Sequence, residues 1–215
     1  MPAPLPSRKG RQPEVNGESV KTATVVLAFL ATCIPAFGQG VIYNNGPDTG
    51  TIGAWPINYG HRVSNSFRLD SDSTVTDVVL SIWDVNERNN PETAQWKITT
   101  APFGGTTLYS GGGILGFLGY FEGRLWVVWS MKIQNMNAHL PRGTYYLEVY
   151  DVHTRWNTWA FWGENDGIGC TSVGCPSTGY FGPTMPTGYE MVIGSESFQV
   201  LGTIDGSELE KRGRQ

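Results

Sequence analysis

The chain has 215 residues, of which 40% are hydrophobic, 12% aromatic and only 16% charged, and its formal net charge is −4. This length allows one domain with a sizeable core, and the weak negative charge argues against nucleic acid and anionic lipid as partners. Few charges combined with 28 glycines, 13 prolines and many aromatic residues are typical of secreted β-proteins.

The segment 21–39 has the layout of a secretory signal peptide. Lys21 is followed by the apolar run Ala23–Ala31 and by small residues around Phe37, which indicates cleavage after Gly38. The run is too short for a transmembrane anchor, which needs about 20 apolar residues. We therefore expect residues 1–38, an N-terminal extension plus signal peptide, to be removed and the mature protein to be extracellular.

Two features qualify this expectation about processing. The polar segment Met1–Val20 is longer than a normal n-region, and a true translation start near Val20 would explain it. Leu30–Cys33 resembles a lipoprotein box, so a lipid anchor at Cys33 is the alternative to free secretion. Four of the 15 basic and two of the 19 acidic residues precede residue 39, so the mature chain carries a net charge of −6.

After removal of Cys33, the cysteines left are Cys170 and Cys175. In an oxidising compartment such a pair predicts a disulfide, here one that closes a four-residue loop. The alternative is a pair of thiolate metal ligands, which a Cys-x₄-Cys spacing without a nearby histidine supports only weakly.

Taken in chain order, β-branched and aromatic residues alternate with polar ones between Gly, Pro and Asn turns. In one such segment Trp96 and Ile98 are expected to face the core, and in another Tyr145, Leu147 and Val149 share a face. The strands predicted in this way cover residues 75–83, 95–100, 106–109, 124–133, 144–150, 157–162 and 190–200.

This spacing predicts an all-β fold, an antiparallel β-sandwich or jelly roll over residues 39–204. Gly111–Gly113 are expected to break the strand that precedes them. The polar segment 205–215 is expected to be a disordered tail.

Several short segments occur in the order found in secreted bacterial proteins of the PEP-CTERM type, which the region 41–203 resembles. The resemblance implies an exported β-sandwich that is often associated with exopolysaccharide-producing bacteria. The end of the chain departs from that pattern, because no Val-Pro-Glu-Pro motif and no apolar helix follow Thr203, which favours free secretion. The segments that carry the resemblance are Val41–Pro47, Ser66-Phe67, Trp96–Thr99, Phe103–Leu108, Gly143–Leu147, Trp162–Asn165 and Glu196–Phe198.

The segment 155–166 is the first candidate for ligand binding. Trp156, Trp159 and Trp162 recur every third residue, so a regular strand would have to place at least one of them outward or at a sheet edge. Exposed indole rings can cover the apolar faces of sugars while polar side chains bind the hydroxyls. The predicted site consists of Trp156, Asn157, Trp159, Trp162, Glu164 and Asn165. The competing interpretation is that these tryptophans fill the core.

Catalysis is a weaker hypothesis for the same region. A glycoside hydrolase needs two carboxyl groups about 5–9.5 Å apart across one bond. Glu164 with Asp166 or Asp151 is the candidate pair, although acids in a turn are usually solvated. No sequence motif of a serine hydrolase or a zinc protease is present.

The loop 84–92 is a candidate calcium site. Asp84, Asn86, Glu87 and Asn89 place hard oxygen ligands close together, although their spacing does not match an EF-hand. Such residues are also common in hairpin turns. No other cofactor is expected.

The preferred interpretation is a secreted, non-enzymatic β-sandwich module that binds extracellular polysaccharide. The alternatives are a secreted carbohydrate-active hydrolase and a purely structural matrix or adhesion protein. The oligomeric state is not indicated by the sequence.

Overall fold

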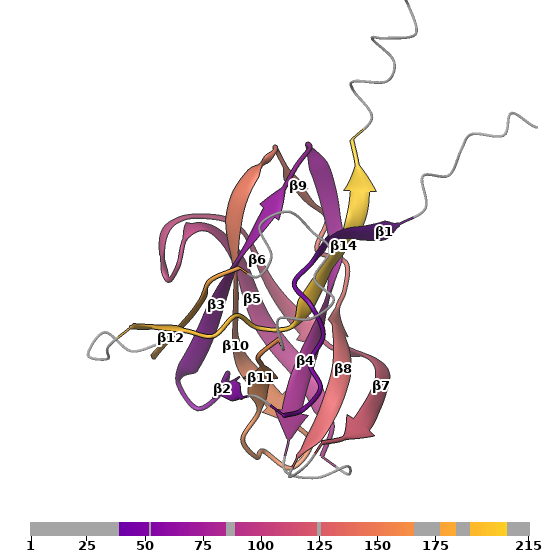
Figure 1. Ribbon diagram of the computed structural model, residues 1–215, viewed down its shortest axis with the longest axis vertical. Helices are drawn as coiled ribbons and strands as arrows, with labels where there is room; N and C mark the ends of the chain where they lie inside the picture. The colour runs from indigo at the N-terminus through magenta and orange to yellow at the C-terminus, as the bar shows by residue number, and fades with distance from the viewer. Residues whose placement is uncertain are drawn as a thin grey trace, which may run out of the picture. The chain divides into compact units, whose positions relative to one another are not determined.

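The structure is a computed structural model that describes residues 39–51, 53–84, 89–123, 126–165, 177–183 and 190–205. The predicted leader 1–38 and all but the first residue of the predicted tail lie outside these residues, as do Cys33, Cys170 and Cys175. The described part consists of strands, turns and loops, arranged as two antiparallel sheets packed face to face (Figure 1).

The first sheet is built around β4, the longest strand of that sheet. One edge of β4 pairs with β14 and then with β11, and the other edge pairs with β9 and then with β8. The outer strands are β1 next to β14, β2 next to β11 and β7 next to β8. The strands are β1 (Gly40–Asn44), β2 (Ala54–Pro56), β4 (Ser73–Asp84), β7 (Gly116–Glu122), β8 (Val127–Ile133), β9 (Ala138–Leu140), β11 (Phe161–Gly163) and β14 (Phe198–Ile204).

The second sheet has the order β13-β12-β3-β10-β5-β6 among the described residues. Its central strand β10 pairs along most of its length with β3 on one side and β5 on the other. The strands are β3 (His61–Leu69), β5 (Pro91–Ala101), β6 (Gly104–Ile114), β10 (Gly143–Thr154), β12 (Gly179–Pro183) and β13 (Met191–Ile193).

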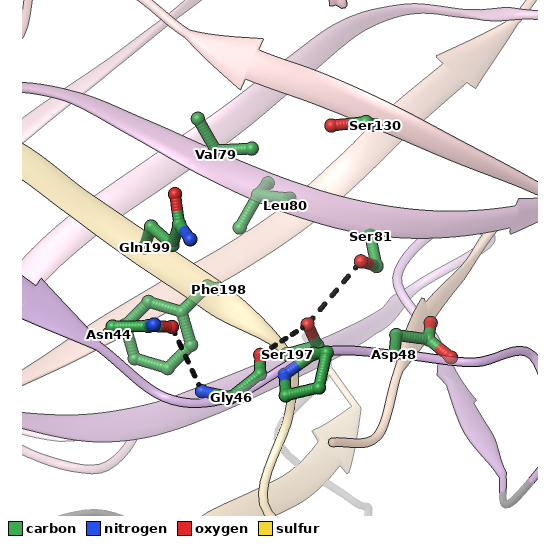
Figure 2. Close-up of a pocket in the computed structure, with 11 residues that line it drawn as sticks. Asn44, Gly46, Asp48, Val79, Leu80, Ser81, Ser130, Ser197, Phe198 and Gln199 are labelled. Carbon is green, nitrogen blue, oxygen red and sulfur yellow. Dashed lines mark hydrogen bonds between the residues drawn. The ribbon is translucent and has the colours of Figure 1, made fainter. Parts of the chain in front are cut away.

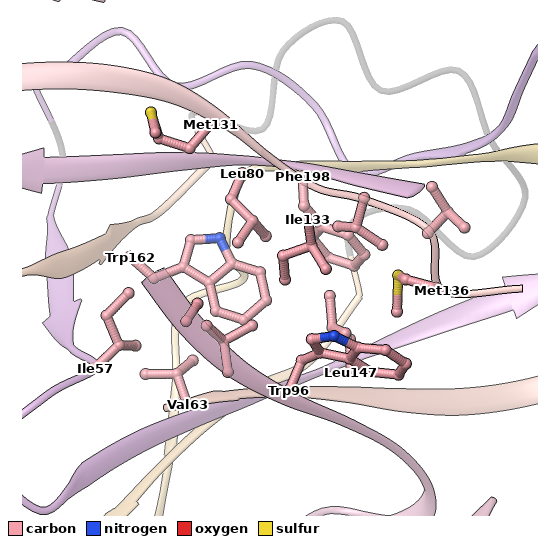
Figure 3. Packing of buried hydrophobic residues seen from close by; sticks show 14 of the residues in the cluster. Ile57, Val63, Leu80, Trp96, Met131, Ile133, Met136, Leu147, Trp162 and Phe198 are labelled. Carbon is pink, nitrogen blue, oxygen red and sulfur yellow. The ribbon is translucent and has the colours of Figure 1, made fainter. Parts of the chain in front are cut away.

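The hydrophobic core lies between the two sheets. Every second side chain of a strand points to the same face, so alternating apolar residues from both sheets meet in the interior. Figure 3 shows Leu80, Ile133 and Trp162 of the first sheet directed toward Val63 and Leu147 of the second. The predicted inward residues are confirmed as buried: Trp96, Ile98, Tyr145, Leu147 and Val149.

The structure corrects three of the predicted strand boundaries. Gly111–Gly113 do not break a strand, because β6 continues through them to Ile114 in register with β5. The segment 157–162 is a turn that leads into the short strand β11, and the segment 190–200 contains two short strands, β13 and the start of β14. Sequence alternation thus locates the long central strands well and the short or glycine-rich ones poorly.

Candidate functional site

The three tryptophans of the predicted ligand site have different environments. The exposed fraction of the side chain is 53% for Trp156 and 42% for Trp159, whereas Trp162 is fully buried. The Trp162 Nε1 donates a hydrogen bond to the Ser197 carbonyl oxygen at 3.0 Å, and its ring packs against Phe198. Trp162 is therefore a core residue and is not available to a ligand at the surface.

A turn after β10 explains why the strand periodicity fails here. The Asn157 N–H donates to the Thr154 carbonyl oxygen at 2.9 Å, and Asn157 has a φ of 54°, in the left-handed region that asparagine tolerates. The chain reverses within this turn before β11 begins at Phe161. Trp156 and Trp159 lie on the turn and face solvent, whereas Trp162 lies on the strand and faces the core.

Trp159 belongs to a group of aromatic rings. The ring of Tyr59, which is 48% exposed, meets Trp159 edge to face with a centroid distance of 4.8 Å. On another side Trp159 stacks on Phe161 at 6.0 Å, and Phe161 in turn contacts Trp126 at 5.5 Å. We call the exposed rings of this group, Tyr59 and Trp159, together with the exposed Trp156 on the same turn, the aromatic surface.

Buried polar residues fix the turn that carries this surface. The Asn89 side chain donates to Asp84 Oδ2 at 2.5 Å and accepts a hydrogen bond from the Trp156 main-chain N–H at 2.6 Å. The Thr158 hydroxyl donates to Asp84 Oδ1 at 3.1 Å. Asp84 and Asn89 are both fully buried, so their hydrogen bonds have little competition from water.

Two of the four predicted calcium ligands thus hold the aromatic turn in place. Asn86 and Glu87, the other two, lie outside the described residues. Within the part of the chain that the structure describes, no group of three or more His, Cys, Asp or Glu residues is arranged to hold a metal ion.

The opposite side of the turn is held by Asn58, a residue that the sequence did not single out. Its amide nitrogen donates to the Thr158 carbonyl oxygen at 2.8 Å, and its amide oxygen accepts from the Ala160 N–H at 3.3 Å. The neighbouring Tyr59 hydroxyl donates to the Asn157 carbonyl oxygen. These partners are about 100 residues apart in the chain, so only the pairing of the strands reveals that they belong to one site.

Glu164 and Asn165 do not join the aromatic surface. Glu164 follows Trp162 by two residues and so points to the same side, where its Oε1 accepts a hydrogen bond from Trp55 Nε1 at 2.6 Å. Asn165 is 9% exposed, and its amide donates to the Glu196 carbonyl oxygen at 3.4 Å.

The structure pairs Glu164 with a carboxyl group that sequence reasoning missed, that of Glu196. The two residues lie directly opposite each other in an antiparallel bridge, which places their side chains on the same face. Glu196 is fully buried, and neither of its carboxyl oxygens has a hydrogen-bond partner among the residues that the structure describes. Burial, reinforced by the nearby charges of Glu164 and Asp48, raises the pKa of Glu196 well above its usual value.

The two acids proposed as partners of Glu164 are placed differently. Asp151 is exposed on β10, in the irregular stretch between Tyr150 and His153 where the pairing with β5 shifts, and its φ is 49°. Asp166 lies outside the described residues.

A polar hollow lies on the outer face of the first sheet (Figure 2), with a volume of about 420 Å³. Its polar groups bind mainly one another: the Ser197 hydroxyl donates to the Gly46 carbonyl oxygen at 2.8 Å, and Asn44 Oδ1 accepts from the Gly46 N–H at 3.0 Å. This network holds the segment after β1 against β14, which is a structural role.

No known protein family matches this sequence, and no characterised protein is significantly similar to it. Among the described residues no helix is long and apolar enough to cross a membrane.

Proposed function

We propose that this protein is a non-enzymatic, exported β-sandwich module that binds polysaccharide through the aromatic surface of Tyr59, Trp156 and Trp159. The observation that carries the proposal is the exposure of Trp156 and Trp159 on a turn that buried residues hold in place, with the exposed Tyr59 ring packed against Trp159. The proposal also includes export by the secretory signal predicted for residues 21–38. It further includes a jelly-roll connection of the strands in the sandwich.

The chemistry of the surface fits a sugar ligand. Tyr and Trp rings offer flat apolar faces with a polar edge, which match the C–H faces and hydroxyl groups of a pyranose. Asn157 and Arg155 are exposed beside the two tryptophans and can bind hydroxyl groups. A rigid turn also lowers the entropy lost on binding, because the rings are ordered before the ligand arrives.

The hydrolase alternative has less support. Glu164 and Glu196 are the two acids that lie side by side, but Glu196 is fully buried and a glycosidic bond has no access to it. A pair of this kind needs both carboxyl groups to face the bond that is cleaved.

Affinity electrophoresis of the full-length protein on a panel of bacterial and plant polysaccharides tests the proposal. We expect one class of glycan to retard the wild type, and the W159A variant to lose at least about tenfold in affinity, because it removes the ring that contacts Tyr59. Y120A is the matched control, since Tyr120 is 51% exposed on β7, at the edge of the sheet remote in strand order from β11.

The melting temperature of W159A should stay close to that of the wild type, because the side chain is largely exposed. Absence of retardation on every glycan, or equal retardation of wild type and W159A, contradicts the proposal.

A further inference from the structure

The side of the sandwich carries a second hollow, which we call the Trp96 groove, with a volume of about 590 Å³. Its walls are Ser110–Ile114 of β6 in the second sheet and Gln134–Met136 between β8 and β9 of the first sheet, and Trp96 of β5 also lines it. Figure 3 shows Met136 next to the Trp96 ring. The volume is in the range of ligand-binding pockets, about 300–1,000 Å³.

The β6 segment that lines the groove lies between two fixed points. At one end the Tyr109 hydroxyl donates to the His139 carbonyl oxygen at 3.1 Å and accepts from the His139 N–H at 3.2 Å, which links β6 to β9. At the other end the buried Leu115 carries the chain from β6 into β7. Tyr109 and Leu115 are six positions apart in extended chain, which corresponds to a length of about 20 Å.

Trp96 lines the groove with its indole ring. The residue is only 7% exposed, so most of the ring is packed against its neighbours. A side chain on Gly111 would press on this indole, since a Cβ there would lie 2.8 Å from Trp96 Cζ2 and 3.2 Å from Nε1. The absence of a side chain at position 111 therefore lets the Trp96 indole lie against the main chain of β6.

The main chain of β6 adds donors and acceptors. The Leu115 N–H donates to the Glu92 carbonyl oxygen. In an antiparallel pair, every second residue forms main-chain hydrogen bonds with the neighbouring strand, so in this register Gly113 and Gly111 also form hydrogen bonds with β5. The N–H and C=O groups of Gly112 and Ile114 then point away from β5. Among the described strands β6 is the outermost on this side of its sheet.

The described residues of the lining provide amide, hydroxyl, main-chain and apolar groups, and none of them is Lys, Arg, Asp or Glu. Gln134 and Asn135 are exposed, and each amide can both donate to and accept from a hydroxyl group. A ligand held by these groups carries many donors and acceptors and no charge. We propose that the Trp96 groove is a second binding site that takes a short segment of a neutral oligosaccharide.

This inference shares its ligand class with the proposed function and therefore rests on it. A direct test follows the indole N–H signals of the isotope-labelled full-length protein by NMR while neutral hexasaccharides of glucose, xylose, mannose and N-acetylglucosamine are added. The Trp96 signal is identified by its absence in W96F. We expect it to move, and to move in W159A as well.

Gly113 provides a variant that should fill the groove without disturbing the fold. A Cβ built on Gly113 meets no atom within 4 Å, and the same holds for Gly119 of β7, which does not line the groove. In the W159A background we expect G113V to weaken the remaining binding at least about tenfold and G119V to leave it unchanged. Circular dichroism should show that both variants stay folded.

The outcomes separate the two proposals. If other indole signals move while the Trp96 signal does not, or if G113V and G119V bind equally well, the proposal for the groove is contradicted. The proposal for the aromatic surface is then unaffected. Movement of the Trp96 signal alone, with binding lost in G113V and kept in W159A, supports the groove and contradicts the aromatic surface. If no probe and no polysaccharide affects the wild type, both proposals fail.

Discussion

At the scale of single residues, Glu196 is the most unusual group in the structure. It is a fully buried carboxyl group without a hydrogen-bond partner among the described residues, and it lies opposite the carboxyl group of Glu164. Ionising it in this position costs free energy, because burial removes it from water and the charges of Glu164 and Asp48 repel the negative form. The raised pKa is the consequence, and it makes the stability of the domain depend on pH.

The direction of this dependence follows from proton binding. Between the ordinary pKa of a glutamate, 4.5, and the raised pKa of the folded state, Glu196 binds more protons in the folded than in the unfolded chain. Its contribution to the free energy of unfolding is therefore fully present below pH 4.5 and is lost as the pH rises through the folded pKa.

We expect E196Q to remove this loss, because glutamine stays neutral at every pH. Relative to the wild type, the variant should gain stability between pH 5 and pH 8, by roughly 1–3 kcal/mol at the upper end, because each unit by which the pKa is raised is worth about 1.4 kcal/mol once the pH exceeds the folded pKa. Chemical denaturation of both proteins across this range measures the difference. E164Q should weaken the pH dependence of the wild type, because it removes the neighbouring like charge. A constant difference between wild type and E196Q at all pH values contradicts the assignment.

At the scale of elements, the turn between β10 and β11 depends on residues from elsewhere in the chain. Asn89 bonds both the Asp84 carboxylate and the Trp156 main chain. We expect N89A to destabilise the domain by about 1–3 kcal/mol, since it leaves buried groups unsatisfied, and to weaken glycan binding several-fold because the turn loses its fixed geometry.

N90A is the matched control for this prediction. Asn90 is the next residue, but it contacts the turn through its main chain, where its carbonyl oxygen accepts the Arg155 N–H at 3.1 Å. Urea denaturation and affinity electrophoresis should therefore distinguish N89A from both N90A and the wild type. Equal behaviour of the two variants would show that the Asn89 side chain does not hold the turn.

The elements also show how far the sequence can predict this fold. Strands of the sheet centres, β4, β5 and β10, are buried on the core face along their length, so alternation identifies them. Strand β6 is an exposed outer strand in which glycines face larger neighbours such as Trp96, so it carries no alternation. Strand periodicity places Trp162 in the predicted ligand site, whereas it is a core residue, because a turn and not a strand precedes it.

The candidate sites could be predicted only where their residues are close in sequence. Trp156 and Trp159 were found because they are neighbours in the chain, whereas Tyr59 and Asn58 reach the same turn from about 100 residues away. The Trp96 groove and the Glu164–Glu196 pair arise from contacts between distant strands, and no local signal marks them. Strand pairing, which a single sequence does not encode locally, decides all three.

At the scale of the whole molecule, the aromatic surface and the Trp96 groove belong to the same folded domain and to different strands. Two sites on one rigid body can bind one polymer together, and the second contact then forms at a high effective concentration. Neither site needs to be strong by itself for the protein to hold a polysaccharide firmly.

This arrangement predicts how affinity depends on the length of the glycan. The dissociation constant should be lower for a long polymer than for a hexasaccharide. We expect this decrease to be at least about tenfold greater for the wild type than for W159A or G113V, because each of these variants keeps only one site. Binding measured along a length series of the glycan that retards the wild type tests this expectation, with G119V as the control that keeps both sites. If the dissociation constants of the wild type, G119V, W159A and G113V all change with glycan length to the same extent, the two sites do not act together on one glycan chain. Only simultaneous contact at both sites makes the wild type gain more affinity from a longer polymer than its single-site variants do.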